Sequence, residues 1–192
     1  MRCAKCSRFS LAIICTQCEQ ILSQYEQGCR LVDGLKVYYF YKYSDIKEIV
    51  LSKHNLYGSF AISRLAQLCM AKFANEFSFG STISVVPLDD NTKSGYSHTA
   101  ILAKSLKNTD LQPVYRAIRA TNSVKYAGKS LEFRQKNPRG FKLLKKIDNP
   151  VILVDDIITT GTSILEAKKV LKKAGINVLF GIVLADARED SY

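Results

Sequence analysis

One stretch of the chain decides the fold: Val151-Ile152-Leu153-Val154-Asp155-Asp156-Ile157-Ile158-Thr159-Thr160-Gly161-Thr162-Ser163. Its first four residues are aliphatic, which is typical of a strand that is buried on both faces. Two carboxylates and two further apolar residues follow, and then a hydroxyl-rich loop that contains one glycine. Thr162 or Ser163 can cap a helix, and an amphipathic pattern continues from there to Gly175. The stretch therefore predicts a strand over 151–155, a loop and a helix.

The loop after this strand has the chemistry of an anion site. Backbone amides at the start of a helix have no partner within the helix, and the helix dipole is positive at this end. Gly161 lets the backbone approach an anion closely. Hydroxyl donors are added by Thr159, Thr160, Thr162 and Ser163. We therefore expect these residues to hold a phosphate group without the help of a lysine.

The paired acids Asp155 and Asp156 would repel a phosphate, so they must serve another purpose. Carboxylates accept hydrogen bonds from vicinal hydroxyls, and they orient the water molecules of a magnesium ion. A ribose 5-phosphate group offers a phosphate to the loop and a diol to the acids. The stretch therefore predicts a sugar phosphate ligand, with its phosphate at the loop and its diol, or a magnesium ion, at the acids.

A nucleotide P-loop and a plain structural turn fit the stretch less well. A P-loop requires the pattern GxxxxGK[ST], and both its lysine and its spacing are missing here. A plain strand–turn–helix would account for a capping Thr162 or Ser163. It would not account for two acids that stand side by side at the end of the strand.

Segments on either side of the stretch alternate between strand and helix patterns. Strands are expected at 36–43, 83–87, 114–118, 151–155 and 176–185. Helices are expected at 19–28, from 44–45 to 53, from 58–59 onward, at 98–106 behind the capping residue Ser97, and from 162–163 to 175. Such alternation predicts an α/β fold with a parallel sheet covered on both faces. In such folds, ligands bind beyond the carboxyl ends of the strands.

Four cysteines near the N-terminus form the pattern CxxC-x8-CxxC, and they are Cys3, Cys6, Cys15 and Cys18. Two such pairs can surround a structural zinc ion with four thiolates and leave no open position for catalysis. Iron–sulfur ligation and incidental surface thiols are the alternatives. The segment is too short to form its own core, so we expect the metal to hold it together. We place a zinc module at residues 1–30 and the α/β domain at residues 31–192.

Composition and charge limit the classes to which the protein can belong. Its 192 residues are 47% hydrophobic and 23% charged, as in ordinary globular proteins. No apolar run approaches the ~20 residues of a membrane helix, so membrane insertion is not expected. The apolar segment before Cys15 is too short for an export signal, which predicts a cytoplasmic protein. The formal net charge of +11 favours an anionic partner, such as nucleic acid, an anionic membrane surface or a phosphorylated small molecule.

The stretch 151–163 resembles the signature of the type I phosphoribosyltransferases over its whole length. In that family the paired acids contact the ribose hydroxyls, and the resemblance implies that Asp155 and Asp156 are the candidate catalytic residues. It also implies that the ligand is phosphoribosyl diphosphate (PRPP), bound with Mg²⁺. The implied PRPP-binding residues are Asp155, Asp156, Ile157, Thr159, Thr160, Gly161, Thr162 and Ser163. Mg²⁺ would lie between the ribose hydroxyls and the diphosphate. Related transferases hold the diphosphate at the loop after Leu88, where Lys93 is the candidate cation.

A narrower resemblance covers nearly the entire chain. The cysteine pairs, Val86-Pro87-Leu88, Gly95-Tyr96, Arg134…Asn137…Gly140-Phe141 and the signature together look like the ComF family of competence proteins. Its members combine a zinc finger with a phosphoribosyltransferase-like domain and are associated with the handling of single-stranded DNA in natural transformation. The resemblance implies single-stranded DNA and a helicase of the DNA-uptake apparatus as partners. The chain departs from the family's RGFNQ pattern, because Ser97 and His98 stand in place of the Asn and the Gln.

Two functions are compatible with these patterns. The first is a competence-associated protein that binds PRPP with Mg²⁺ and handles single-stranded DNA. Basic side chains of the protein that can bind the phosphate backbone of single-stranded DNA support this first function. The candidate DNA-binding residues are Arg134, Lys136, Arg139, Lys168, Lys169 and Lys172. Lysines on a helix more often form only a solvated face. The alternative function is a catalytically active phosphoribosyltransferase that acts on a nucleobase or another acceptor.

Overall fold

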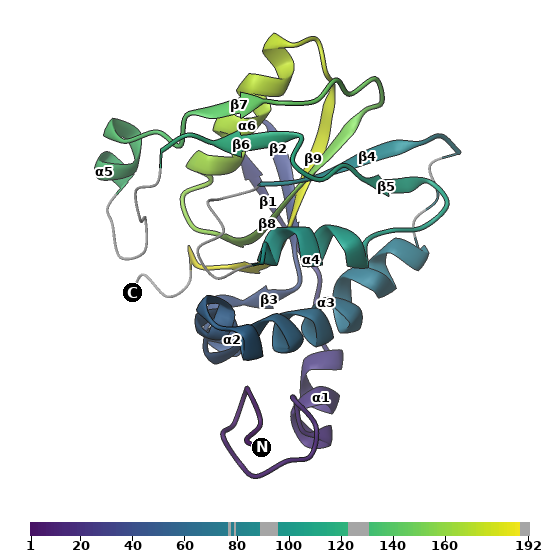
Figure 1. The fold of residues 1–192 in the computed structure, drawn as a ribbon, viewed down its shortest axis with the longest axis vertical. Coiled ribbons are helices and arrows are strands. Elements are labelled where there is room, and N and C mark those ends of the chain that lie inside the picture. The colour runs from purple at the N-terminus through teal and green to yellow at the C-terminus, as the bar shows by residue number, and fades with distance from the viewer. Residues whose placement is uncertain (77, 79, 89–95, 123–130, 189–192) are drawn as a thin grey trace.

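The computed structural model describes residues 1–76, 78, 80–88, 96–122 and 131–188. Its main sheet has seven strands: β1 (Gly28–Val32), β2 (Leu35–Tyr39), β3 (Tyr41–Lys42), β4 (Ile83–Pro87), β5 (Leu111–Pro113), β8 (Val151–Ile158) and β9 (Val178–Asp186). The order is β1-β2-β9-β8-β4-β5, and β3 also pairs with β9 (Figure 1). Within the described part of this sheet, the hairpin β1–β2 is antiparallel and the other pairs are parallel.

Helices cover both faces of the sheet. The helices of the described residues are α1 (Thr16–Ser23), α2 (Tyr43–Leu51), the 3-10 helix η1 (Ser52–His54), α3 (Leu56–Glu76), α4 (His98–Ser105), α5 (Leu131–Lys136) and α6 (Thr162–Lys173). Side chains of the central strand β8 alternate between two buried clusters. Ile152 and Val154 pack with α3 and α4, whereas Val151 and Leu153 pack with α6. Because β8 is buried on both faces by this alternation, the structure confirms the predicted α/β fold, with a mixed but mostly parallel sheet.

A small second sheet lies beside α6. It pairs β6 (Ile118–Ala120) with β7 (Phe141–Leu143) in antiparallel register, and Figure 1 shows it next to α6. The carboxylate of Glu166, on α6, accepts the backbone amides of Arg139 and Gly140 at 2.9 and 2.6 Å. This acid therefore ties the segment before β7 to the helix.

Most of the predicted elements are present, although several of their ends differ. β4 has the predicted bounds, and the Ser97 hydroxyl caps α4 by accepting the Ala100 amide at 3.1 Å. β8 continues to Ile158, because this end of the strand still pairs with β9. The predicted strand 114–118 is wrong. A turn in which Arg116 has a φ of +55° separates β5 from β6.

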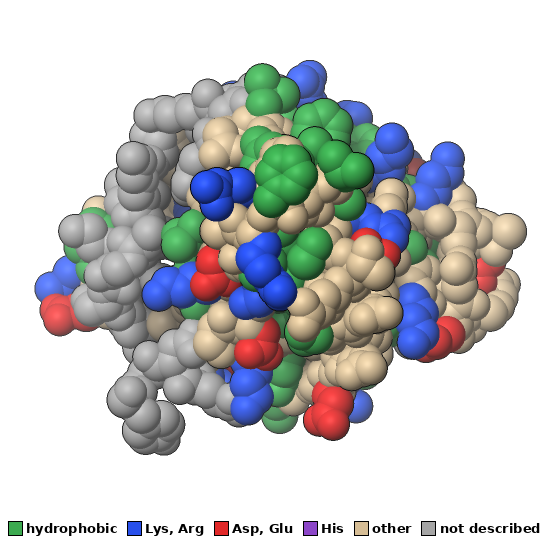
Figure 2. Space-filling model, turned by 90° about the horizontal axis from the view of Figure 1, so that it is seen from below, with side chains coloured by type: hydrophobic (Ala, Val, Ile, Leu, Met, Phe, Trp, Pro, Cys, Tyr) green, Lys and Arg blue, Asp and Glu red, His purple; other side chains and the backbone are tan. Residues whose placement is uncertain are grey.

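The N-terminal segment packs against α2 and α3. Cys18 belongs to the same buried cluster as α3, and Lys5 Nζ lies 3.0 Å from Glu48 Oε2 of α2. Viewed from this end, the surface carries a group of hydrophobic side chains among Lys and Arg side chains (Figure 2). Exposed apolar residues of this end are Phe9, Leu11, Ile21, Leu56 and Phe60. The division of the chain at residue 30 stays a prediction. None of the helices that the structure describes is both long and apolar enough to cross a bilayer.

Helix α6 approaches the sheet closely because Gly181 of β9 has no side chain. A Cβ atom at Gly181 would lie 2.3 Å from Ile164 Cδ1 and 3.2 Å from a methyl carbon of Val37. Ile164 lies in the first turn of α6, directly after the predicted phosphate loop. The glycine therefore sets the distance between the sheet and the helix that carries this loop.

We expect Gly181→Ala to destabilise the protein by about 1–3 kcal/mol, because the added methyl group overpacks this contact. Ile164→Val removes the Cδ1 atom and should by itself cost about 0.5–1.5 kcal/mol. In the double variant the missing Cδ1 makes room for the new methyl group, so the loss should be smaller than the sum. Urea unfolding of the four proteins measures these free energies. Additive losses would contradict the packing described here.

Candidate functional site

The predicted phosphate loop joins the end of β8 to the first turn of α6. Gly161 precedes the helix with a φ of +79°, a conformation that favours glycine. A Cβ atom at this position would also lie 2.5 Å from Val32 Cγ1. The hydroxyls of Thr160 and Thr162 lie 2.8 Å apart. Both threonines are half-buried, so the loop is a compact turn whose hydroxyls keep access to solvent at the N-terminus of a helix.

A cation that the sequence did not indicate supports this loop. Arg30, on β1, donates from Nη1 to the Thr159 carbonyl oxygen at 2.5 Å and lies 3.1 Å from Asp186 Oδ1. Asp186 is buried at the end of β9, and its Oδ2 accepts Arg188 Nε at 2.9 Å. Arg30 therefore fixes the backbone of the loop through a carbonyl group. No local pattern marks it, because it stands 129 positions away from Thr159 in the chain.

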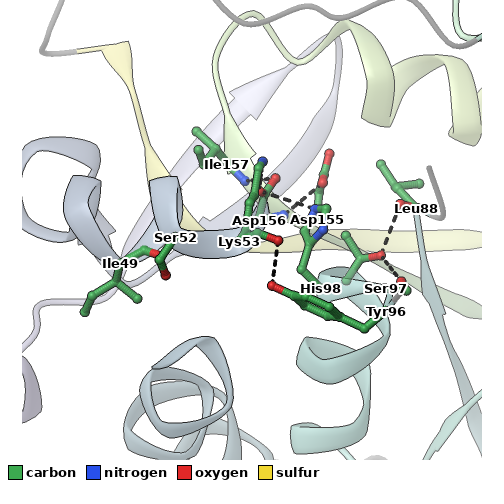
Figure 3. Close-up of polar contacts among 11 residues, drawn as sticks. Ile49, Ser52, Lys53, Leu88, Tyr96, Ser97, His98, Asp155, Asp156 and Ile157 are labelled. Atoms are coloured by element: carbon green, nitrogen blue, oxygen red, sulfur yellow. Dashed lines mark hydrogen bonds and ion pairs between the residues drawn. The ribbon is translucent and has the colours of Figure 1, made fainter. Parts of the chain in front are cut away.

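The two adjacent acids have different surroundings. Asp156 is buried, and its Oδ2 atom lies 2.5 Å from Lys53 Nζ and 3.4 Å from His98 Nε2 (Figure 3). Burial would raise the pKa of Asp156, but the charge of Lys53, and then that of His98, outweighs it and holds this pKa well below its usual range. Asp155 is half-buried, and its Oδ1 accepts the Asp156 amide at 2.9 Å. Of the pair, Asp155 is thus the acid with more access to solvent.

Three segments that are distant in sequence converge on Asp156. Lys53 lies in η1, and its carbonyl oxygen accepts the Tyr96 hydroxyl at 2.6 Å (Figure 3). His98 is the first residue of α4, and Thr99 of the same turn donates to the Leu88 carbonyl oxygen at 3.2 Å. Asp156 lies near the carboxyl end of β8, and parallel α/β sheets bind their ligands at this edge. Sequence reasoning missed Lys53, which no motif marks.

The basic residues proposed for DNA lie in part on one side of the molecule. Lys168, Lys169 and Lys172 are on α6, and Lys169 and Lys172 are exposed. Glu166 holds the backbone of Arg139 beside the same helix. Lys136 lies on α5 and pairs with Glu132 at 2.7 Å. Lys93 and the side chain of Arg134 lie outside the described residues.

The fold and the site together consist of a mostly parallel sheet, a central strand that carries two acids near its carboxyl end, and a hydroxyl-rich turn before a helix. The model of the phosphoribosyl transferase domain family matches residues 61–192. The chain belongs to this family. Residues before 61 lie outside the match, and they include the cysteine cluster, Arg30 and Lys53.

Known phosphoribosyltransferases share short or distant similarity with the chain. Orotate phosphoribosyltransferase of Leptospira biflexa is 55% identical over 38 residues, which are 20% of this chain and 20% of that protein. The structure of a hypoxanthine phosphoribosyltransferase from Staphylococcus aureus is 16% identical, with 65% of this chain and 62% of that chain covered and a TM-score of 0.41. Orotate phosphoribosyltransferase of Mycobacterium tuberculosis is 17% identical, with 88% and 82% covered and a TM-score of 0.41. The chain spans less than two thirds of the first two relatives.

The phosphoribosyltransferase domain is preceded by a cysteine cluster that fits a structural zinc ion. The sulfur atoms of Cys3, Cys6, Cys15 and Cys18 lie within 4.8 Å of one another. Four Zn–S bonds of about 2.3 Å in a tetrahedron place the sulfur atoms roughly 3.8 Å apart. Cys6 Sγ and Cys15 Sγ are separated by 3.8 Å.

Hydrogen bonds favour the thiolate form of Cys3 and Cys6, whereas burial raises the pKa of Cys18 to about 12. The Cys15 amide donates to Cys3 Sγ at 3.3 Å, and Arg8 Nε donates to Cys6 Sγ at 3.4 Å. The bond from the Arg8 side chain lowers the pKa of Cys6 to about 6. Such contacts to the ligands orient them and favour the deprotonated form that binds a metal.

We expect the purified protein to contain about one zinc ion per chain, as a closed four-thiolate site does. Cys15→Ser should reduce the bound zinc and lower the melting temperature, because a structural metal contributes directly to folding. Cys29→Ser is the matched control, since Cys29 is exposed and lies outside the cluster. Elemental analysis and thermal unfolding measure both quantities. Iron in place of zinc would favour the iron–sulfur alternative. If the purified protein contains no metal and Cys15→Ser leaves its melting temperature unchanged, a metal centre is excluded.

Proposed function

We propose that the chain binds PRPP with Mg²⁺ at the loop between β8 and α6. The observation that carries this proposal is the turn at Gly161, which places backbone amides and hydroxyls at the N-terminus of α6 directly after the paired acids. Phosphate would be held by Thr159, Thr160, Gly161, Thr162 and Ser163. Asp155 and Asp156 would accept the ribose hydroxyls, with Ile157 beside them, and Mg²⁺ would bridge the hydroxyls and the diphosphate. Membership of the phosphoribosyl transferase domain family supports this ligand.

We further propose that the protein handles single-stranded DNA as a competence protein of the ComF type. A four-cysteine cluster before a phosphoribosyltransferase domain supports this proposal, as does the net charge of +11. The exposed lysines of α6 lie beside β7, which adds the exposed Lys142. Cations spaced along one side of a protein can follow the backbone of a single strand. A helicase of the DNA-uptake apparatus belongs to the same proposal.

Transfer of the phosphoribosyl group is the second candidate function, which family membership favours. Displacement of diphosphate from C1 gives a sugar with oxocarbenium character, which a nearby carboxylate stabilises. Asp155 is the better placed of the two acids, because Lys53 and His98 surround Asp156. Diphosphate released from PRPP on addition of a nucleobase or of DNA would establish transfer.

Asp155→Asn should weaken the binding of PRPP in the presence of Mg²⁺ by about tenfold or more, because hydrogen bonds to charged groups are worth about 1.5–3 kcal/mol. Isothermal titration calorimetry measures this affinity. Asp148→Asn makes the same chemical change before the other end of β8, where Asp148 is exposed and pairs with Lys146 at 2.8 Å. This control should bind as the wild type does. Equal affinity in the Asp155 variant would remove the ribose assignment.

Binding of a fluorescent single-stranded oligonucleotide should weaken steeply as salt increases, with a slope of roughly −0.7 per phosphate contact. Lys169→Gln/Lys172→Gln should lower both the affinity and the magnitude of this slope. Lys104→Gln/Lys107→Gln is the matched control, since it removes the same charge from two exposed lysines at or next to α4, on the other face of the sheet. Fluorescence anisotropy at several salt concentrations measures the slopes. Equal slopes in the two double variants would exclude this side of α6 as the DNA surface.

A further inference from the structure

Lys53 occupies a position that the phosphoribosyltransferase signature does not explain. It lies in η1, outside the residues that the family model matches, and is 103 positions away from Asp156. Its ammonium group nevertheless lies 2.5 Å from Asp156 Oδ2, at the end of the strand that carries the signature (Figure 3). A residue from outside the matched part of the chain therefore contacts one of the two acids on which the ligand depends.

This ion pair competes with the proposed ligand. On Asp156, the Oδ1 atom accepts the Ile157 amide at 2.9 Å, and Oδ2 faces both Lys53 and His98. Two donors thus already face the two lone pairs of Oδ2, so a ribose hydroxyl that donates to this atom competes with the lysine. Separating a buried ion pair is unfavourable unless each partner gains a replacement. The ribose hydroxyls and His98 replace the lysine at Asp156, so the remaining question is what Lys53 gains.

The structure leaves Lys53 able to change its partner. Its side chain is 22% exposed, compared with 11% for Asp156, so the lysine is the more solvent-accessible partner of the pair. Its backbone is held independently of the ion pair, because the Lys53 carbonyl oxygen accepts the Tyr96 hydroxyl at 2.6 Å. The flexible four-carbon stem of a lysine can therefore move while the main chain stays in place.

The chemistry of PRPP supplies the partner that Lys53 needs. The diphosphate is attached to C1 of the ribose, and one hydroxyl of the diol is on the adjacent carbon C2. A cation beside the carboxylate that binds the diol is thus close to the diphosphate oxygens. Ammonium-to-phosphate contacts are among the strong charge-assisted hydrogen bonds.

We propose that Lys53 is a ligand-binding residue that leaves Asp156 for the diphosphate of PRPP when the ribose hydroxyls bind the carboxylate. This inference rests on the proposed binding of PRPP at the loop after β8. It gives Lys53 a role in specificity. Ribose 5-phosphate would also have to displace the lysine from Asp156, but it offers no diphosphate in return, so the exchange disfavours it.

The test compares the affinities for PRPP and ribose 5-phosphate, both with Mg²⁺, in each protein. Calorimetry measures the affinity for PRPP. The affinity for ribose 5-phosphate, which we expect to be weaker, is measured by competition against PRPP. Lys53→Met should reduce the preference for PRPP by about tenfold, the value of one charge-assisted hydrogen bond. Lys53→Arg keeps the charge and should retain most of the preference. Lys47→Met is the matched control, because Lys47 is an exposed lysine of the neighbouring helix α2.

The ratio of the two affinities separates a binding role from a structural one. A lysine that only supports the shape of the site would change both affinities together, so an unchanged ratio in Lys53→Met overturns the inference. If the wild-type protein binds neither compound, the proposed function fails first, and this is visible before any variant is made. Circular dichroism checks that each variant is folded. If Lys53→Met does not fold, Lys53→Gln replaces it in the same comparison of affinities.

Discussion

The turn at Gly161 is the constraint on which the rest of the site depends. Its φ of +79° lets α6 begin directly after β8, and Val32 occupies the space where any other side chain would start. On the same side, Arg30 holds the carbonyl group of Thr159. Both supporting residues belong to β1, the outer strand of the antiparallel hairpin. This hairpin therefore supports the predicted phosphate loop, although it lies before the residues that the family model matches.

Burial gives the two acids their different properties. A carboxylate that is removed from water needs a compensating charge, and Lys53 with His98 supplies it to Asp156. A cation that is already paired with a carboxylate offsets its field, so the carboxylate stabilises a developing positive charge on a sugar less than the same group would without that cation. Asp155 is half-buried, and its Oδ1 atom accepts an uncharged backbone amide. The two adjacent acids thus differ in their surroundings, because Lys53 and His98 face only Asp156 among the contacts described above.

The half of the site that lies in one continuous stretch was predictable, and the other half was not. Strand, acids, loop and helix follow one another from Val151 to Ser163, so that periodicity and residue type are enough to assign them. The spacing of the cysteines was equally informative. Arg30 and Lys53, in contrast, reach their partners through tertiary packing, and a lone basic residue in a short strand or turn carries no local signal. The predicted strand 114–118 failed for a related reason: β-branched and aromatic residues favoured a strand, but a backbone turn at Arg116 interrupts it.

The positive charge of α6 has two physical roles, and they apply to different lysines. Lys172 and Lys173 lie in the last turn, where a positive charge complements the negative end of the helix dipole and contributes about 0.3–1 kcal/mol without any partner. The same dipole presents its positive end to the phosphate loop. Lys168 and Lys169 lie in the middle of the helix, where the dipole offers them little. The charges of Lys168 and Lys169 therefore favour an anionic partner more than the charges in the last turn do.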